Sequence, residues 1–161
     1  MSRTTALPFV AHGWALYAHP CFSAQINALQ EQVTGLKTKQ PKQYKNKNAY
    51  KRLAAVVELA FDKIPQNPAL PEYRQGRTLG PAHTHWCRAK FFQQYRLFFR
   101  FHAGSKIIVY AWVNDTDTKR AYGSSDDAYL VFRKMLASGH PPTDWDALLA
   151  ASQAASDPFG L

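Results

Sequence analysis

Two stretches in the N-terminal half repeat apolar residues at the spacing of an α-helix. The first comprises Phe22, Ile26, Leu29, Val33 and Leu36, with Pro20 ahead of them at a first-turn position. The second comprises Ala49, Leu53, Val56, Val57, Ala60 and Ile64, and Pro65 ends it. Each spacing puts one apolar stripe along a helix face. The pattern therefore predicts a helical hairpin, broken at residues 39–41, whose stripes face a shared core.

From residue 86 the pattern changes to the alternation of a β-strand. Between residues 87 and 101 the odd positions are mostly apolar, whereas the even positions carry cations and aromatic rings. Because successive side chains point to opposite faces, only a loop with an odd number of residues keeps both patterns intact. A three-residue loop over 92–94 does so and sets Lys90 opposite Arg96.

A third strand is expected over residues 106–113, after a turn at 103–105. The same parity argument sets Phe98 opposite Tyr110, which predicts an antiparallel meander of three strands. One face of this meander, which we name the cationic face, carries Trp86, Arg88, Lys90, Arg96, Phe98, Arg100, Tyr110 and Trp112. The other face carries Phe91, Leu97, Phe99, Phe101, Ile107, Val109 and Ala111. That apolar face needs the helical hairpin as its cover.

The C-terminal part predicts two more helices. The first has Ser124 or Ser125 as its N-cap and Gly139 as its stop. The second runs from Asp144 to about residue 155, with Thr143 as its cap. The fold class is therefore α+β: an N-terminal helical hairpin packed on a small antiparallel sheet, followed by C-terminal helices. We expect a single domain over residues 1–161, with a core at about 13–149 and tails at 1–12 and 150–161.

Composition narrows the class of protein. Hydrophobic residues make up 46% of the 161 residues, which excludes intrinsic disorder. No apolar run approaches the ~20 residues of a membrane helix, and the first residues lack the apolar stretch of a secretory signal. Cys21 and Cys87 are far apart and have no metal or redox spacing. We expect a cytoplasmic protein with reduced thiols, no cofactor, no metal and no membrane partner.

The charge of the chain is basic and concentrated in its middle. The 20 Lys and Arg residues outnumber 11 Asp and Glu residues, which gives a net charge of +9. Residues 37–100 hold 14 basic and three acidic residues, whereas residues 115–161 hold four basic and seven acidic residues. A localised surplus of this kind favours a polyanionic partner such as nucleic acid.

The cationic face is suited to RNA, because guanidinium groups bind phosphates bidentately and aromatic rings stack on unpaired bases. In a catalytic version, Arg88 and Arg96 stabilise the charge that grows on a scissile phosphate. The candidate RNA-binding residues around them are Trp86, Lys90, Arg100, Tyr110, Trp112 and Lys119, and the further catalytic candidates are Arg120, Tyr122 and His140. A structural interpretation stays open: the rings can be core under the C-terminal helix, and the arginines a solvated sheet face.

Several motifs resemble those of one known family. They are residues 13–22 (GWALYAHPCF), residues 95–100 (YRLFFR), Asp127-Ala128-Tyr129, and Gly139-His140-Pro141-Pro142 before Asp144-Trp145. The resemblance covers roughly residues 13–149 and is to the YhaV toxins, a group within the RelE superfamily of ribonucleases.

The resemblance implies a RelE-like fold and a type II toxin that cleaves RNA without a metal, by 2′-hydroxyl attack, and so inhibits translation and growth. It implies a PrlF-like antitoxin with an AbrB fold, RNA either free or on the ribosome, and operator DNA bound only through the toxin–antitoxin complex. It places Arg96 beside the scissile phosphate, Arg88 on the same face, and Arg120 and Tyr122 near the substrate. Two alternatives are a non-catalytic RNA- or ribosome-binding module and an antitoxin-binding subunit whose basic second helix docks an acidic partner.

Overall fold

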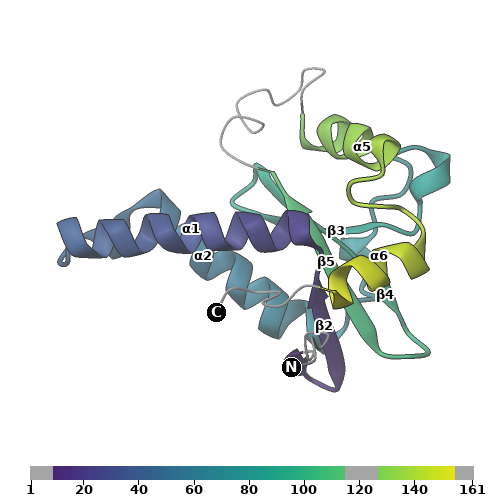
Figure 1. Cartoon of the computed structure of the whole chain (residues 1–161), viewed down its shortest axis with the longest axis horizontal. Coiled ribbons are helices and arrows are strands. Elements are labelled where there is room, and N and C mark those ends of the chain that lie inside the picture. The colour runs from purple at the N-terminus through teal and green to yellow at the C-terminus, as the bar shows by residue number, and fades with distance from the viewer. Residues whose placement is uncertain (1–8, 115–126, 155–161) are drawn as a thin grey trace, which may run out of the picture.

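The computed structural model describes residues 9–114 and 127–154. In this part the chain is α+β, with a five-stranded mixed sheet and helices packed on both of its faces (Figure 1). The strands are β1 (Phe9–Ala11), β2 (Trp14–Ala18), β3 (Cys87–Phe91), β4 (Tyr95–His102) and β5 (Ile107–Val113). The longer helices are α1 (Pro20–Lys39), α2 (Asn48–Glu58), α5 (Ala128–Ser138) and α6 (Trp145–Gln153). The predicted α+β class is confirmed.

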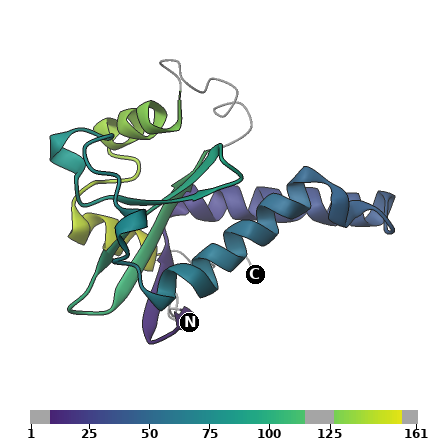
Figure 2. The ribbon, with the colours of Figure 1, turned by 180° about the vertical axis from the view of Figure 1, so that it is seen from behind.

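Helices α1 and α2 lie side by side, and the end of α1 extends with the start of α2 well beyond the sheet (Figures 1 and 2). Helix α1 begins at Pro20, as its sequence predicts, and His19 caps it by accepting the N–H of Cys21 on Nδ1 at 3.0 Å. Its buried positions, among them Phe22 and Ile26, all lie in the first half of the helix. The projecting half of α1 therefore packs on α2 rather than on the sheet.

The second helix is shorter than its apolar pattern predicts. Helix α2 ends at Glu58, a π-helical turn follows over Leu59–Lys63, and α3 (Ile64–Gln66) completes the segment. Pro65 has no N–H and its ring clashes with the carbonyl four residues earlier, which favours the wider turn. In the π-helical pattern the Ile64 N–H donates to the Leu59 carbonyl. The partner of the next carbonyl, that of Ala60, would be Pro65, so this carbonyl receives no helical hydrogen bond.

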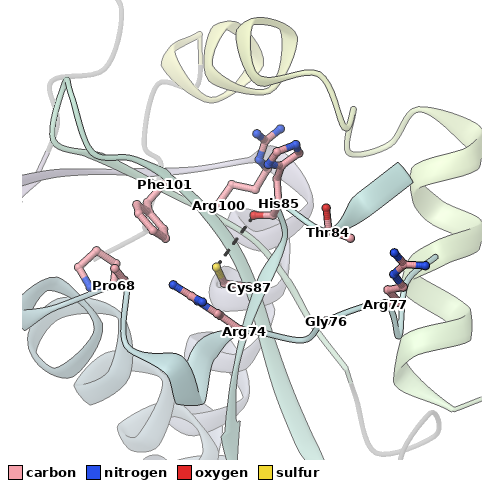
Figure 3. Close-up of a pocket in the computed structure, with 10 residues that line it drawn as sticks. Pro68, Arg74, Gly76, Arg77, Thr84, His85, Cys87, Arg100 and Phe101 are labelled. Atoms are coloured by element: carbon pink, nitrogen blue, oxygen red, sulfur yellow. Dashed lines mark hydrogen bonds between the residues drawn. The ribbon is translucent and has the colours of Figure 1, made fainter. Parts of the chain in front are cut away.

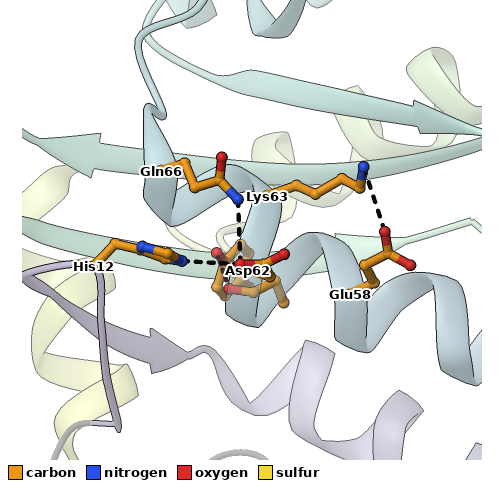
Figure 4. A network of polar contacts seen from close by, with 7 residues as sticks. His12, Glu58, Asp62, Lys63 and Gln66 are labelled. Atoms are coloured by element: carbon orange, nitrogen blue, oxygen red, sulfur yellow. Dashed lines mark hydrogen bonds and ion pairs between the residues drawn. The ribbon is translucent and has the colours of Figure 1, made fainter.

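A polar network joins the turn between β1 and β2 to the π-helical turn (Figure 4). His12 Nε2 lies 2.9 Å from Asp62 Oδ1, and Gln66 Nε2 donates to the same oxygen at 3.2 Å. Lys63 and Glu58 form an ion pair at 3.4 Å beside it. The hydrogen bonds from His12 and Gln66 hold the pKa of the exposed Asp62 carboxyl below its ordinary value.

The strand order is β1-β2-β5-β4-β3, with β2 parallel to β5 and the other neighbouring pairs antiparallel. The predicted β3–β4–β5 meander is present, but the prediction of a purely antiparallel sheet is wrong. Sequence alternation misses β2 because Trp14–Ala18 is covered on both sides and is a continuous apolar run.

The register of β3 and β4 confirms the sequence argument, whereas that of β4 and β5 overturns it. Lys90 pairs with Arg96 across a loop over residues 92–94. Between β4 and β5 the turn has four residues, which flips the first half of β5 to the other face. A bulge at Ala111 restores the expected face, so Phe98 lies opposite Trp112 instead of Tyr110.

Two apolar clusters enclose the sheet. The cluster beneath α1, α2 and the π-helical turn includes Phe22, Ile26, Val56, Leu97, Phe99, Ile108 and Tyr110. The cluster beneath α5 and α6 includes Trp86, Phe98, Val109, Ala111, Trp112, Phe132 and Leu148. The predicted assignment of Ile107, Val109 and Ala111 to the hairpin side is therefore wrong. Both faces of the sheet are covered by helices.

The caps of the C-terminal helices differ from those expected. Asp127 caps α5 by accepting the Leu130 N–H at 3.1 Å, and Ser124 and Ser125 lie outside the described residues. Gly139 ends α5 in the left-handed conformation, as predicted, with φ of 85°. Helix α6 is capped by Asp144, whose carboxylate accepts a backbone N–H at 3.0 Å, and not by Thr143. None of the described helices is long and apolar enough to cross a bilayer.

Candidate active site

The aromatic rings predicted for the cationic face are core residues. Trp86 and Phe98 are fully buried and Trp112 is 9% exposed, beneath α5 and α6. Phe132 of α5 stacks on Phe98 and on Trp112, with ring centroids 4.3 and 5.7 Å apart. The prediction that Trp86 and Trp112 offer stacking surfaces to RNA bases is therefore wrong, because α5 and α6 take those surfaces.

Tyr110 lies on the opposite face from the one predicted. The four-residue turn before β5 directs its side chain towards α1 and the π-helical turn, where it is fully buried. Its hydroxyl donates to the Ala60 carbonyl at 2.5 Å, and burial raises the pKa of this hydroxyl well above its ordinary value. Tyr110 is thus a core residue and cannot contact RNA on the predicted face.

Arg88 and Arg96 meet at one hydroxyl group, that of Tyr129 in the first turn of α5. Arg88 Nε donates to Tyr129 Oη at 2.9 Å and Arg96 Nε donates to the same atom at 3.1 Å. The two arginines come from the neighbouring strands β3 and β4 and point to the same side of the sheet, as the alternation predicts. We name these three residues the arginine–tyrosine cluster.

Backbone carbonyls fix the direction of both guanidinium groups. Arg88 Nη1 donates to the carbonyls of Glu72 and Arg74 at 2.7 and 3.0 Å. Arg96 Nη1 donates to two carbonyls at the β3–β4 turn at 2.7 and 3.1 Å. Within residues 9–114 and 127–154, Nη2 of neither arginine has a hydrogen-bond partner. Two oriented donors of this kind can hold an anion without reorganising.

The sequence argument missed Tyr129. Its place in the apolar stripe of α5 indicates a core ring, and the ring does pack edge-on against Phe98, with centroids 5.7 Å apart. Only its hydroxyl reaches the arginines, and the side chain is half-buried. A tyrosine among phenylalanine and leucine residues at the start of the helix is the one signal that could have marked it.

The other predicted RNA-binding cations are at two ends of the sheet. Lys90 is exposed on β3 beside Arg96. Arg100, near the far end of β4, donates to the Thr143 carbonyl at 2.5 Å, and its guanidinium lies 6.0 and 5.5 Å from the ring centroids of Trp86 and Trp145. Burial lowers the pKa of the Arg100 guanidinium.

The remaining catalytic candidates do not join the cluster. His140 is exposed and follows the last turn of α5, so the helix, about 16 Å long at ~1.5 Å per residue, separates it from Tyr129. It lies instead near His19, whose pKa falls to about 4 because of burial and, secondly, the charge of His140. Lys119, Arg120 and Tyr122 lie outside the described residues.

A basic pocket opens at the sheet edge next to the cluster (Figure 3). It has a volume of about 520 Å³ and includes Arg74, Arg77, His85, Cys87, Arg100 and Phe101 in its lining. Burial raises the pKa of the Cys87 thiol to about 11, although three nearby guanidinium groups favour the thiolate. Cys87 is therefore not a nucleophile near neutral pH. In the described part of the chain, no three His, Cys, Asp or Glu side chains gather as a metal site requires.

Comparison with known proteins connects this geometry to a family. The family model that matches residues 16–153 is described as a toxin with endonuclease activity, of a toxin–antitoxin system. The chain belongs to the YhaV toxin family. The matched residues contain the whole arginine–tyrosine cluster and the basic pocket.

Curated YhaV toxins match the chain over most of its length. Toxin YhaV of Escherichia coli O6:H1 and Ribonuclease toxin YhaV of Escherichia coli K12 are each 47% identical to it over 143 residues. Toxin YhaV of Escherichia coli O157:H7 shows the same identity. Each alignment covers 88% of this chain and 93% of the relative. No solved structure matches this YhaV family member.

Proposed function

We propose that this toxin is an endoribonuclease whose active centre is the arginine–tyrosine cluster. The observation that carries the proposal is the shared hydrogen bond: one hydroxyl accepts from two guanidinium groups of adjacent strands. A hydroxyl that accepts two hydrogen bonds still has its own proton to donate. The cluster therefore offers an acid flanked by two cations, at a place where Arg88 is only half-buried.

Cleavage by 2′-hydroxyl attack needs these groups. The 2′-oxygen forms a bond to the adjacent phosphorus, its proton passes to a base, and the bond to the 5′-oxygen of the next nucleotide breaks. Arg88 and Arg96 stabilise the additional negative charge on the phosphate oxygens, and Tyr129 gives its proton to the departing 5′-oxygen. The products are a 2′,3′-cyclic phosphate and a 5′-hydroxyl end, and the chemistry as proposed requires no metal.

The described residues on either side of 115–126 lie at the same centre. Asn114, just before it, accepts the Arg96 N–H on Oδ1 at 2.6 Å, and Asp127, just after it, caps the helix that carries Tyr129. Asn114 and Asp127 thus both lie at the cluster. We propose that Lys119, Arg120 and Tyr122 bind substrate there, with Tyr122 as a candidate base, and that Lys90 binds a neighbouring phosphate.

The biological setting follows from the family. We propose that the toxin acts in the cytoplasm, that cleavage of RNA, free or on the ribosome, inhibits translation and growth, and that a PrlF-like antitoxin with an AbrB fold neutralises it. Operator DNA would then be bound only by the complex. The strand order β2-β5-β4-β3, with β2 parallel to β5 and α1 and α2 between β2 and β3, supports a RelE-like arrangement.

The test is cleavage of RNA by purified protein in EDTA. Tyr129→Phe removes the acid and keeps the ring against Phe98, so kcat should fall by roughly 100-fold or more, with the products otherwise unchanged. Lys51→Ala, which removes an exposed cation of α2, serves as the charge control and should cleave like the wild type. Wild-type kcat in Tyr129→Phe would refute the assignment, and RNA binding without any cleavage would favour a non-catalytic module.

A further inference from the structure

The basic pocket exists because β3 starts later than its neighbour ends. Strand β3 begins at Cys87, opposite Phe99, so β4 continues through His102 without a strand on its outer side. The connection over residues 68–77 and the residues before β3 surround the uncovered edge (Figure 3). The result is a recess of about 520 Å³, within the ~300–1,000 Å³ range of small-ligand sites.

Basic side chains line this recess. Arg74 and Arg77 come from the connection, His85 from the residues before β3, and Arg100 from β4. No carboxylate is among the lining residues in the described part of the chain. A lining with basic side chains and no carboxylate favours an anionic ligand.

The recess also has an apolar side. Phe101, Pro68 and Ala69 line it together with the basic residues. An aromatic ring beside guanidinium groups matches a nucleotide, whose base stacks and whose phosphate binds arginine. An acidic peptide would use the cations and leave the ring without a role.

The pocket is next to the arginine–tyrosine cluster. Cys87, in its wall, directly precedes Arg88 on β3, and their side chains point to opposite faces of the sheet beside its edge. The Arg74 carbonyl accepts a hydrogen bond from Arg88 at 3.0 Å, while the Arg74 side chain lines the pocket. The segment at Arg74 therefore contacts the cluster through its backbone and the pocket through its side chain, so an RNA chain held at the cluster extends towards the pocket.

We infer that the pocket binds the RNA nucleotide next to the dinucleotide that contains the scissile phosphodiester, with its phosphate among the basic residues of the lining and its base against Phe101. This inference rests on the proposed ribonuclease function. It makes the pocket a specificity site: the cluster provides the chemistry, and the pocket selects the nucleotide next to the cleaved dinucleotide.

The first test compares a minimal dinucleotide, which contains only the scissile linkage, with RNAs extended by one nucleotide at either end. For the wild type, extension on one side should lower KM by about tenfold, the value of a stacked or charge-paired nucleotide. Arg77→Ala should abolish that advantage and leave kcat and the dinucleotide KM unchanged. Phe101→Leu should reduce it and alter the preferred base. An equal effect of Arg77→Ala on both substrates, or none on either, would overturn the inference.

The second test separates this inference from the proposed chemistry. The Tyr129→Phe protein is titrated with a fluorescent copy of the extended RNA. Binding is then measured whether or not the protein cleaves RNA. Adding Arg77→Ala should weaken binding about tenfold, whereas Lys39→Ala, an exposed cation at the far end of α1, should not. Unchanged RNA binding after Arg77→Ala would overturn the pocket assignment. It would also be overturned if the protein bound oligoglutamate and Arg77→Ala removed that binding while RNA binding stayed intact.

Discussion

Tyr110→Phe tests whether this side chain belongs to the core or to an RNA surface. The substitution removes one hydroxyl and keeps the ring, which packs against Phe22 and Phe99 with centroids about 6 Å away. The lost hydroxyl leaves the Ala60 carbonyl without its donor. Helix geometry supplies no replacement, because Pro65 occupies the position whose N–H would donate in the π-helical pattern.

The cost follows from that missing donor. A buried carbonyl left without a hydrogen bond costs ~1–3 kcal/mol, and Tyr110 is fully buried. We expect the free energy of unfolding to fall by about 2 kcal/mol. For a chain of this size the melting temperature should then fall by roughly 4–8 °C.

The assay pairs unfolding in urea with the KM for RNA cleavage. Tyr110→Phe should lower stability and leave KM unchanged. Tyr50→Phe is the matched control: Tyr50 is half-buried on α2 with its ring edge-on to Tyr44, and its change should cost less than ~0.5 kcal/mol. A Tyr110→Phe protein with wild-type stability and a raised KM would contradict both the register of β5 and the core role.

Two further predictions concern His19 and Leu97. The pKa of folded His19 is about 4 against ~6.5 when unfolded, so only the unfolded chain binds the proton between these values; stability should fall by roughly 3 kcal/mol as pH drops from 6.5 to 4. His19→Asn keeps a capping side chain, so its free energy of unfolding, measured in urea, should fall less over that pH range. The same pH dependence in His19→Asn and the wild type would contradict the burial argument. Leu97→Ala, at a fully buried position facing α1 and α2, should cost ~2–5 kcal/mol, and an unchanged melting temperature would refute that placement.

The pairing of β3 and β4 could be predicted because a single rule decides it. Alternating apolar and polar residues flank a short loop, and only an odd loop keeps Lys90 opposite Arg96. The start or end of a helix could also be predicted from the sequence where one residue sets it. Pro20 marks the start of α1 and Gly139 the end of α5. These signals are local, so the rest of the fold does not alter them.

The register of β5 could not be predicted because two irregularities compensate for each other. A four-residue turn moves Tyr110 to the wrong face, and the bulge at Ala111 brings Trp112 back. The residues of β5 are apolar throughout, and both faces of the sheet are buried, so no polar position within the strand marks the shift. Burial on both faces also removes the alternation from which β2 could have been recognised.

For a related reason, only the two arginines of the candidate site could be predicted from the sequence. Alternation places Arg88 and Arg96 on one face, but it does not say how much of that face α5 covers. The helix covers the rings of Phe98 and Trp112 and places its first turn against the arginines, where Tyr129 joins them. Helix α5 thus buries the aromatic rings of the cationic face and also supplies the Tyr129 hydroxyl, which the sequence argument had not placed there. If the proposed chemistry holds, the RNA meets the sheet at its β3–β4 edge, where Arg88 and the basic pocket are open, and not across its face.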